Sequence, residues 1–287
     1  MKRGLMKVLS FLAKRFVAGI TLDSAIGAAK KFKEKNINAT IDHLGEDVLN
    51  RAAANYATSV YIKILERIKK EKLNANISIK LTKIGLAIDK NFCFENFKKI
   101  AIAAKRLHLR LEVDMEGSAN TEMTMHLYKK ILKYNNDVIQ AIQAYLYRAY
   151  SDADEIVRLK GSLRIVKGAY KENEIVAYQK KSDVDKNYRK ILNSFLGKSK
   201  FIAIATHDDA IINFARKIIK KKRIPQKKYE FEMLYGIRPY FKEELAKKGC
   251  AVRCYIPYGE EWFPYYFRRL KERKENIFFL VKNLFKK

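Results

Sequence analysis

Short apolar runs recur along the chain, and amphipathic segments separate them. The intervening segments, such as EDVLNRAAANYATSVYIKILERIKK, carry apolar residues at helical spacing and are too long for hairpin turns. Short apolar runs bounded in this way are typical of buried strands. The runs cover residues 38–42, 77–81, 109–114, 138–144, 163–167, 201–207, 229–233 and 252–257. The pattern therefore predicts eight strands that alternate with helices.

Regular alternation of strands and helices is typical of α/β proteins with a parallel sheet. Eight units in a chain of 287 residues favour a closed (β/α)8 barrel over an open doubly wound sheet. No glycine-rich dinucleotide fingerprint follows the first run, which weakens the open-sheet alternative. No Pro/Ser-rich linker divides the chain. We therefore expect a single domain, with N-terminal helices over residues 1–37 and the catalytic barrel over residues 38–287.

The two ends of the chain are expected to add helices. The opening MKRGLMKVLSFLAKRFVAGI mixes basic residues with short apolar stretches and predicts an amphipathic helix, since it has no continuous apolar span of about 20 residues. After the last run, Pro264 suits the first turn of a final helix, which can lie over the barrel mouth. On that helix Arg268 and Arg269 flank Tyr265, opposite an apolar stripe. The arginine pair is either a solvated face or a clamp for an anion such as a carboxylate.

The chain is strongly basic, because 60 Lys and Arg residues against 31 Asp and Glu residues leave a net charge of +29. Such a charge raises the question of a nucleic acid or an anionic membrane as partner. Much of the excess is lysine spaced along helical segments, as in residues 220–222, and nucleic-acid-binding motifs are missing, so we expect no nucleic-acid partner. The three cysteines leave one unpaired under any disulfide scheme, which favours a reducing cytoplasm. They also have no metal-ligand spacing, which predicts no metal site.

Polar side chains lie at the end of nearly every apolar run. A barrel builds its active site from the C-terminal ends of its strands, so these side chains are candidates for one shared mouth. They are Asp42, Lys80, Asp114, Gln143, Lys167, Thr206, His207, Glu232 and Tyr255. Each is common as a surface residue on its own, whereas their coincidence over eight strands favours a site.

Lys80 lies among apolar residues in ISIKLT, where an unpaired ammonium group is costly. One use is as a positive group for a substrate carboxylate, together with Arg268 and Arg269. The other is as an amine of depressed pKa that forms a Schiff base, with Lys167 as a second candidate for that role. The arginine pair favours the carboxylate site.

Seven motifs near strand ends, together with the opening stretch, resemble the monofunctional proline dehydrogenases. The motifs are ATIDHLGE (39–46), SIKLTKIGL (78–86), LEVDMEGS (111–118), QAYLYR (143–148), LRIVKGAYKE (163–172), ATHD (205–208) and EFEMLYGIR (230–238). The resemblance implies a distorted (β/α)8 barrel and an FAD cofactor, with FMN less favoured. It further implies oxidation of L-proline to Δ1-pyrroline-5-carboxylate, the first step of proline catabolism, with electrons passed to a quinone or another acceptor.

The resemblance also implies roles for individual residues. The cofactor-binding residues are Met115, Gln143, Arg164, Lys167, Gly168, Ala169, Thr206 and His207. The catalytic residues are Asp114 and Arg164, and the substrate-binding residues are Lys80, Tyr255, Arg268 and Arg269, with Leu234 or Tyr265 against the proline ring. Whether Asp114 handles a proton or orients its neighbours stays open. Arg164 either meets the cofactor or forms an ion pair with a carboxylate such as Asp114, and both can hold.

Three positions depart from the common family pattern. His43 stands in place of an aliphatic residue, Gly117 in place of Asp, and Glu232 in place of Gln, which leaves hydroxyproline open as a substrate. A Schiff-base aldolase and a basic RNA-binding barrel are the alternative functions. We expect a cytoplasmic protein, and the basic N-terminus makes peripheral contact with the anionic inner face of the membrane a hypothesis.

Overall fold

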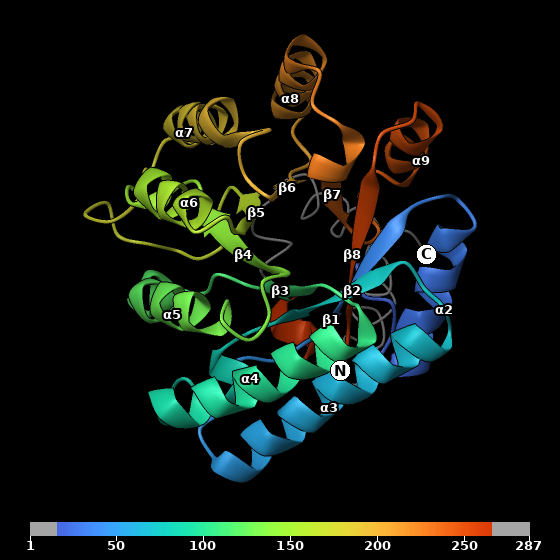
Figure 1. The fold of residues 1–287 in the computed structure, drawn as a ribbon, viewed down its shortest axis with the longest axis vertical. Helices are drawn as coiled ribbons and strands as arrows, with labels where there is room; N and C mark the ends of the chain where they lie inside the picture. The colour runs from blue at the N-terminus through green and yellow to red at the C-terminus, as the bar shows by residue number, and fades with distance from the viewer. Residues whose placement is uncertain (1–15, 266–287) are drawn as a thin grey trace, which may run out of the picture.

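Eight parallel strands close into a barrel (Figure 1). The computed structural model describes residues 16–265. The strands are β1 (Asn38–His43), β2 (Ala75–Ile79), β3 (Leu111–Val113), β4 (Val138–Gln143), β5 (Ser162–Val166), β6 (Phe201–Ala205), β7 (Tyr229–Leu234) and β8 (Val252–Tyr258). Each strand pairs with the next along the chain, and β8 pairs with β1, so that Ile41 lies between Ile77 and Ile256. The predicted closed (β/α)8 barrel is confirmed.

Helices surround the barrel and connect successive strands (Figure 1). They are α2 (Leu22–Lys33), α3 (Arg51–Lys70), α4 (Lys90–Leu107), α5 (Ser118–Ile131), α6 (Ala149–Arg158), α7 (Lys181–Phe195), α8 (Asp209–Lys222) and α9 (Pro239–Lys247), with 3-10 turns η1 (Thr82–Ile84) and η2 (Gln226–Lys228). Helix α2 precedes β1 and packs against β1 and β8. None of these helices of the described chain is long and apolar enough to cross a membrane.

Both predicted terminal helices extend beyond the described residues. The amphipathic helix expected at the start of the chain falls largely on residues 1–15, which lie outside them. Residues 262–265 are helical after β8, and the remainder of the predicted final helix also lies outside. The division into residues 1–37 and 38–287 stays a prediction.

Side-chain caps fix where several helices begin after a strand. At the start of α3, Asn50 Oδ1 accepts a hydrogen bond from the Ala53 amide at 2.8 Å. At the start of α8, Asp208 Oδ1 accepts one from the Ala210 amide at 2.9 Å. The Asp208 cap also brings its carboxylate to the mouth of the barrel, because α8 begins close to the end of β6.

The barrel has an apolar outer face and a polar interior. Outward-facing isoleucines such as Ile77 and Ile202 are fully buried. The buried polar residues that the strands direct inward include Thr40, Asn76, Glu112, Arg164, Glu230, Glu232 and Arg253. This interior explains an error in the predicted boundaries, since β2 starts at Ala75 and not at residue 77. Asn76 points inward to donate a hydrogen bond to Glu112 at 2.9 Å, so the strand begins before its apolar run does.

Candidate active site

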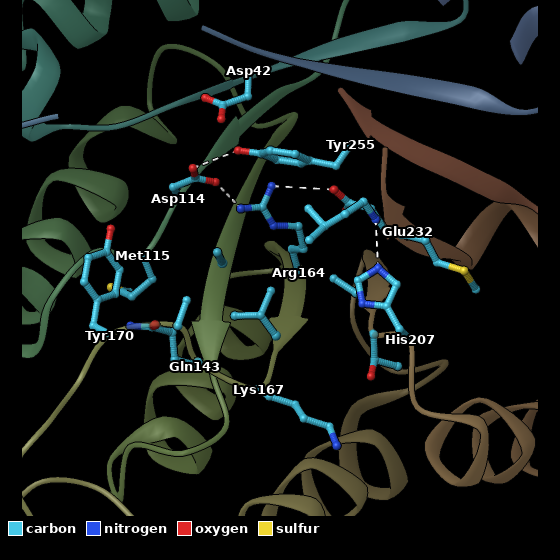
Figure 2. Close-up of a pocket in the computed structure, with 18 of the residues that line it drawn as sticks. Asp42, Asp114, Met115, Gln143, Arg164, Lys167, Tyr170, His207, Glu232 and Tyr255 are labelled. Carbon is cyan, nitrogen blue, oxygen red and sulfur yellow. Dashed lines mark hydrogen bonds and ion pairs between the residues drawn. The ribbon is translucent and has the colours of Figure 1, made fainter. Parts of the chain in front are cut away.

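A cavity of about 520 Å³ lies at the C-terminal ends of the strands (Figure 2). This volume is in the range of about 300–1,000 Å³ that is usual for small-molecule and cofactor sites. The predicted site residues that line it are Lys80, Asp114, Met115, Gln143, Arg164, Lys167, Gly168, Ala169, Thr206, His207 and Tyr255. The structure thus brings together every predicted site residue that it describes, whereas Arg268 and Arg269 lie outside the described residues.

Asp114, directly after β3, is the centre of the hydrogen-bond network in this cavity. Its Oδ1 accepts from Ser78 Oγ at 2.7 Å and from the Arg164 guanidinium. Its Oδ2 accepts from the Tyr255 hydroxyl at 2.9 Å and lies 2.9 Å from Lys80 Nζ. Figure 2 shows the contacts of Asp114 with Tyr255 and Arg164. One carboxylate therefore fixes the positions of three candidate site side chains.

The protonation state of Asp114 decides between the two roles left open for it. Burial alone would raise the pKa of Asp114, but the charges of Lys80 and Arg164 outweigh burial and lower the pKa below its ordinary range. A carboxylate with a lowered pKa is a weak base and stays ionised. The geometry favours the orienting role over proton handling.

Lys80 is a buried cation between two carboxylates. Its Nζ lies 3.0 Å from Asp42 Oδ1 and 2.9 Å from Asp114 Oδ2. Burial favours the neutral amine, but Asp114 and Asp42 outweigh it and raise the pKa of Lys80 well above its ordinary value. A Schiff-base lysine must be neutral to attack a carbonyl group, so the environment of Lys80 argues against the aldolase alternative. Lys167 is also held by carboxylates, with its Nζ 2.7 Å from Asp208 Oδ2.

Arg164, in the middle of β5, joins the network to the cavity. Its Nη1 lies 2.7 Å from Glu112 Oε2 and 3.8 Å from Glu232 Oε1, while Nη2 donates to Asp114. Its guanidinium carbon is 5.3 Å from the ring centroid of Tyr255. The predicted ion pair with Asp114 is present. Among residues 16–265, however, nothing bonds to the buried Arg164 Nε.

The chain turns sharply after β5 at Gly168, whose φ is +122°. A Cβ at this position would lie 2.3 Å from the ring of Tyr145, so only glycine fits. The backbone at Gly168 thus lies directly against the ring of Tyr145. The turn places Lys167, Gly168 and Ala169 along one edge of the cavity.

The end of β6 presents Thr206 and His207 to the cavity. His207 Nε2 accepts a hydrogen bond from the Leu234 amide at 3.0 Å. In the neutral imidazole the proton is then on Nδ1. Thr206 Oγ1 accepts from the Asp208 amide at 3.2 Å. The backbone thus holds both side chains in defined orientations.

Gln143 and Met115 form the opposite edge of the cavity (Figure 2). Gln143 Nε2 donates to the Glu116 carbonyl at 2.9 Å. The Glu116 carboxyl group in turn accepts from the Thr82 amide at 3.1 Å, and burial outweighs these hydrogen bonds and raises the pKa of Glu116 to about 7. The β3–α5 connection is therefore anchored to η1 and β4.

The prediction missed three polar residues that line the cavity: Tyr170, Lys181 and Asp208. Tyr170 and Asp208 lie within the motifs LRIVKGAYKE and ATHD, and their neighbours were predicted as site residues. The Tyr170 hydroxyl donates to Glu46 at 3.1 Å, and Asp208 holds Lys167. Lys181 starts α7, and only the packing of α7 beside the barrel mouth reveals it. Within residues 16–265 no group of three or more His, Cys, Asp or Glu side chains is arranged to hold a metal ion.

Comparison with known proteins agrees with this geometry. A family model described as proline dehydrogenase matches residues 25–282. The chain is 39% identical over 275 residues to proline dehydrogenase 2 of Bacillus subtilis (strain 168), covering 96% of this chain and 91% of the relative. It is 33% identical over 280 residues to the proline dehydrogenase of Deinococcus radiodurans, covering 96% of this chain and 90% of the relative.

A solved structure resembles the barrel as a whole. It is proline utilization A (PutA) from Bdellovibrio bacteriovorus inactivated by N-propargylglycine, with a TM-score of 0.86 and 24% sequence identity. The likeness covers 92% of this chain and 33% of the PutA chain. At this identity the likeness supports the fold alone.

Proposed function

The chain belongs to the proline dehydrogenase family and oxidises proline in proline catabolism, and we propose that the oxidation takes place at the barrel mouth with a bound flavin. The observation that supports this site is the position of Asp114, which directs Lys80, Arg164 and Tyr255 toward one cavity. The product is Δ1-pyrroline-5-carboxylate. When bound, the flavin accepts the hydride equivalent removed from the proline ring.

The cavity suits a flat ligand with hydrogen-bonding groups. Arg164 Nε and Glu232 Oε2 are buried at the cavity wall, and no other described residue bonds to either. Buried polar groups are normally satisfied, so unpartnered groups at a cavity wall fit a ligand that bonds to them. Arg164 also supplies a fixed positive charge, which stabilises the negative charge that a flavin gains on reduction.

We assign the flavin as FAD, with FMN as the alternative. The residues that would hold it are Met115, Gln143, Arg164, Lys167, Gly168, Ala169, Thr206 and His207, all of which line the cavity. Gly168 brings the backbone to the cavity edge, and the remaining side chains offer a cation, an amide, a hydroxyl and an imidazole. Chromatography of the cofactor released from the purified protein identifies it as FAD or FMN.

The substrate side of the site is assigned to Lys80 and Tyr255. The Lys80 ammonium group has three N–H donors, and Asp42 and Asp114 account for two of them. The third donor suits the proline carboxylate, and Arg268 and Arg269 are proposed to complete the clamp. Tyr255 is fixed by Asp114, so that its ring, together with the side chain of Leu234 or Tyr265, forms a wall for the proline ring.

A quinone is the proposed electron acceptor, and the protein is proposed to act in the cytoplasm, at times in contact with anionic lipid. The net charge of +29 supports this contact, because each well-placed Lys or Arg near an anionic surface contributes about 1 kcal/mol. Sedimentation with anionic vesicles at low and high salt tests it. If the protein does not co-sediment at low salt, the proposed contact with lipid is contradicted. The proposed active site at the barrel mouth does not depend on this result.

The site proposal is tested by the visible spectrum of the purified protein and by Lys80→Met. We expect flavin absorption bands that bleach when L-proline is added. Because Lys80→Met removes a charged donor to the carboxylate, it should raise KM for proline by about 10- to 100-fold without loss of bound flavin. Stopped-flow reduction and flavin content measure the two quantities.

Lys242→Met is the matched control, because Lys242 is also buried but does not itself line the cavity, and its Nζ donates to the backbone carbonyl groups of Leu234 and Ile237. It should leave KM close to the wild-type value. An unchanged KM in Lys80→Met contradicts the substrate assignment. A colourless protein that borohydride traps covalently with a carbonyl substrate would instead support the aldolase alternative.

A further inference from the structure

Glu232, on β7, is a buried acid with an incomplete set of contacts at the cavity wall. Its exposed fraction is 3%. Oε1 lies 3.8 Å from Arg164 Nη1, which is a long contact, and Figure 2 shows the two side chains facing each other. Within the described part of the chain, Oε2 has no hydrogen-bond partner. Glu232 is also one of the residues that line the cavity, so its side chain is beside the space that a ligand would occupy.

The barrel interior contains more acids than bases. The buried carboxyl groups are Asp42, Glu112, Asp114, Glu230 and Glu232, and the buried cations that face them are Lys80, Arg164 and Arg253. If all five acids were ionised, this interior would carry two negative charges in excess. An unpaired buried charge is costly, and such a group takes up a proton instead.

The contacts identify which acid lacks a counter-charge. Lys80 lies within 3.0 Å of both Asp42 and Asp114. Arg164 is closest to Asp114 and to Glu112, which is 2.7 Å away. Arg253 lies 2.6 Å from Glu230. Glu232 is the most weakly paired acid, since its one ion-pair contact is the long one to Arg164. With Glu232 neutral, one excess charge remains, and Asp42, Asp114 and Glu112 share it around Lys80 and Arg164.

The surroundings of Glu232 on every side agree with this assignment. Burial, followed by the charges of Glu112 and Glu230, raises the pKa of Glu232 well above its ordinary value, although Arg164 and Arg253 oppose the shift. Two further titratable groups interact electrostatically with it from outside the barrel wall, the hydroxyl of Tyr188 on α7 and the thiol of Cys254 on β8. Burial raises the pKa of both, so neither adds a counter-charge.

We propose that Glu232 is a neutral carboxylic acid and that its Oε2 hydroxyl donates a hydrogen bond to the flavin in the cavity. The inference rests on the proposed function. A carboxylate only accepts hydrogen bonds, whereas a carboxylic acid has one donor and a free acceptor. Flavin rings present carbonyl oxygens and ring nitrogens as acceptors. The assignment of the proton to Oε2 follows because Oε1 faces the Arg164 donor.

Neutrality also matters for the reaction. A flavin gains negative charge on reduction, and a carboxylate at the cavity wall would oppose that gain. A neutral Glu232 lets the charge of Arg164 act on the reduced flavin without an opposing charge beside it. Glu232 is thus a positioning residue that sets both flavin affinity and reduction potential.

The first experiment measures protonation in the flavin-free protein by infrared spectroscopy at pH 7. The C=O stretch of a carboxylic acid should be present in the wild type and lost in Glu232→Gln. Asp42→Asn is the matched control, because Asp42 is equally buried but lies 3.0 Å from its counter-charge on Lys80, and it is not among the charges that act on Glu232. Its difference spectrum should show the loss of carboxylate bands only. Loss of carboxylate bands in Glu232→Gln would overturn the proposal.

The second experiment measures flavin affinity and reduction midpoint potential. Glu232→Gln keeps a donor and removes no charge, so both quantities should stay close to wild type. Glu232→Leu keeps the volume but removes the donor, so flavin affinity should fall about tenfold. A clear rise of the potential in Glu232→Gln would show that the wild-type group is ionised and would overturn the proposal. If Glu232→Leu bound flavin as tightly as the wild type, the proposed hydrogen bond from Glu232 to the flavin would be contradicted.

The two experiments separate this inference from the proposed function. If the protein binds no flavin and does not oxidise proline, the proposed function fails, while the infrared spectrum of the flavin-free protein still decides the protonation of Glu232. Thermal unfolding of each flavin-free variant confirms that it is folded before the affinities are compared.

Discussion

The interior of the barrel contains two buried arginine–glutamate pairs. They differ in whether all of their hydrogen-bonding groups have partners. Near the N-terminal ends of the strands, Arg253 donates to Glu230 at 2.6 Å and to the Ala39 carbonyl, and Asn38 contacts the other Glu230 oxygen at 3.5 Å. No buried nitrogen or oxygen of Arg253 or Glu230 lacks a partner among the described residues. We call this pair the closed layer.

Closer to the C-terminal ends, Arg164 and Glu232 form the open layer. Both are buried as deeply as the closed pair, at 5% and 3% exposure. Yet Arg164 Nε and Glu232 Oε2 have no partner within residues 16–265. The same residue types at the same burial are thus complete in one layer and incomplete in the other. The comparison teaches that a ligand site differs from a structural ion pair in its unsatisfied hydrogen-bonding groups, and not in burial or charge alone.

The largest expected effect separates the layers by activity. Arg164→Lys should lower kcat by about 10²- to 10³-fold, because lysine keeps the charge but lacks the planar fork that reaches Glu112, Asp114 and the cavity together. Steady-state kinetics with L-proline measures the loss. Arg253→Lys is the control, and it should leave kcat nearly unchanged because Arg253 does not line the cavity. Equal losses in the two variants would contradict the difference between the layers.

The second effect separates the layers by stability. Glu230→Gln should lower the free energy of unfolding by about 3 kcal/mol, because Arg253 is left buried without its counter-charge. Glu232→Gln should lower it by less than about 1 kcal/mol, because the proposed neutral acid is replaced by a neutral amide of the same shape. Urea unfolding of the flavin-free proteins at pH 7 provides both values. A larger loss in Glu232→Gln than in Glu230→Gln would reverse the assignment of the layers.

The smallest expected effect is on the pH dependence of stability, and it tests the role of Asp114, which lies beside the open layer. Since the folded-state pKa of Asp114 is lowered, its contribution to stability is present above the unfolded-state pKa of about 3.9 and is lost as pH falls below it. Asp114→Asn should therefore be less stable than wild type at pH 7, by about 1–2 kcal/mol, and should lose less stability on acidification.

Unfolding curves recorded between pH 7 and pH 2 measure this dependence. Asp154→Asn is the surface control, because Asp154 pairs with an exposed Arg158 and such pairs contribute at most about 1 kcal/mol. A wild type and an Asp114→Asn variant that lose stability in parallel would show that Asp114 is not the stabilising carboxylate.

Several features of the fold and the site follow from local patterns in the sequence. Helices covering a barrel leave a helical period in their apolar residues, and strands buried on both faces leave short apolar runs, so the eight units were predictable. The strand-end residues Lys80, Gln143 and Tyr255 were predictable as site candidates because parallel strands all end at one mouth. The resemblance to proline dehydrogenases then supplied the flavin and the substrate.

Other features escaped prediction for physical reasons. The predicted start of β2 was wrong because Asn76 faces the polar interior of the barrel, whereas a prediction from hydrophobic periodicity treats a polar residue as exposed. Glu112 lies within an apolar run, so nothing in the sequence indicated that it, as well as Asp114, binds Arg164. Lys181 reaches the cavity only because α7 begins beside the barrel mouth.

The sequence alone determined the order of strands and helices and the chemical character of the strand ends, because these depend on which face of each segment is buried. Only the tertiary structure decided the partners and the charge states. Tyr255 and Asp114 are 141 residues apart in the chain and 2.9 Å apart in space. The charges that raise the pKa of Glu232 come from β3 and β7, and those that oppose the shift come from β5 and β8. Protonation depends on burial and on all nearby charges together, and folding alone brings those charges into one low-dielectric interior.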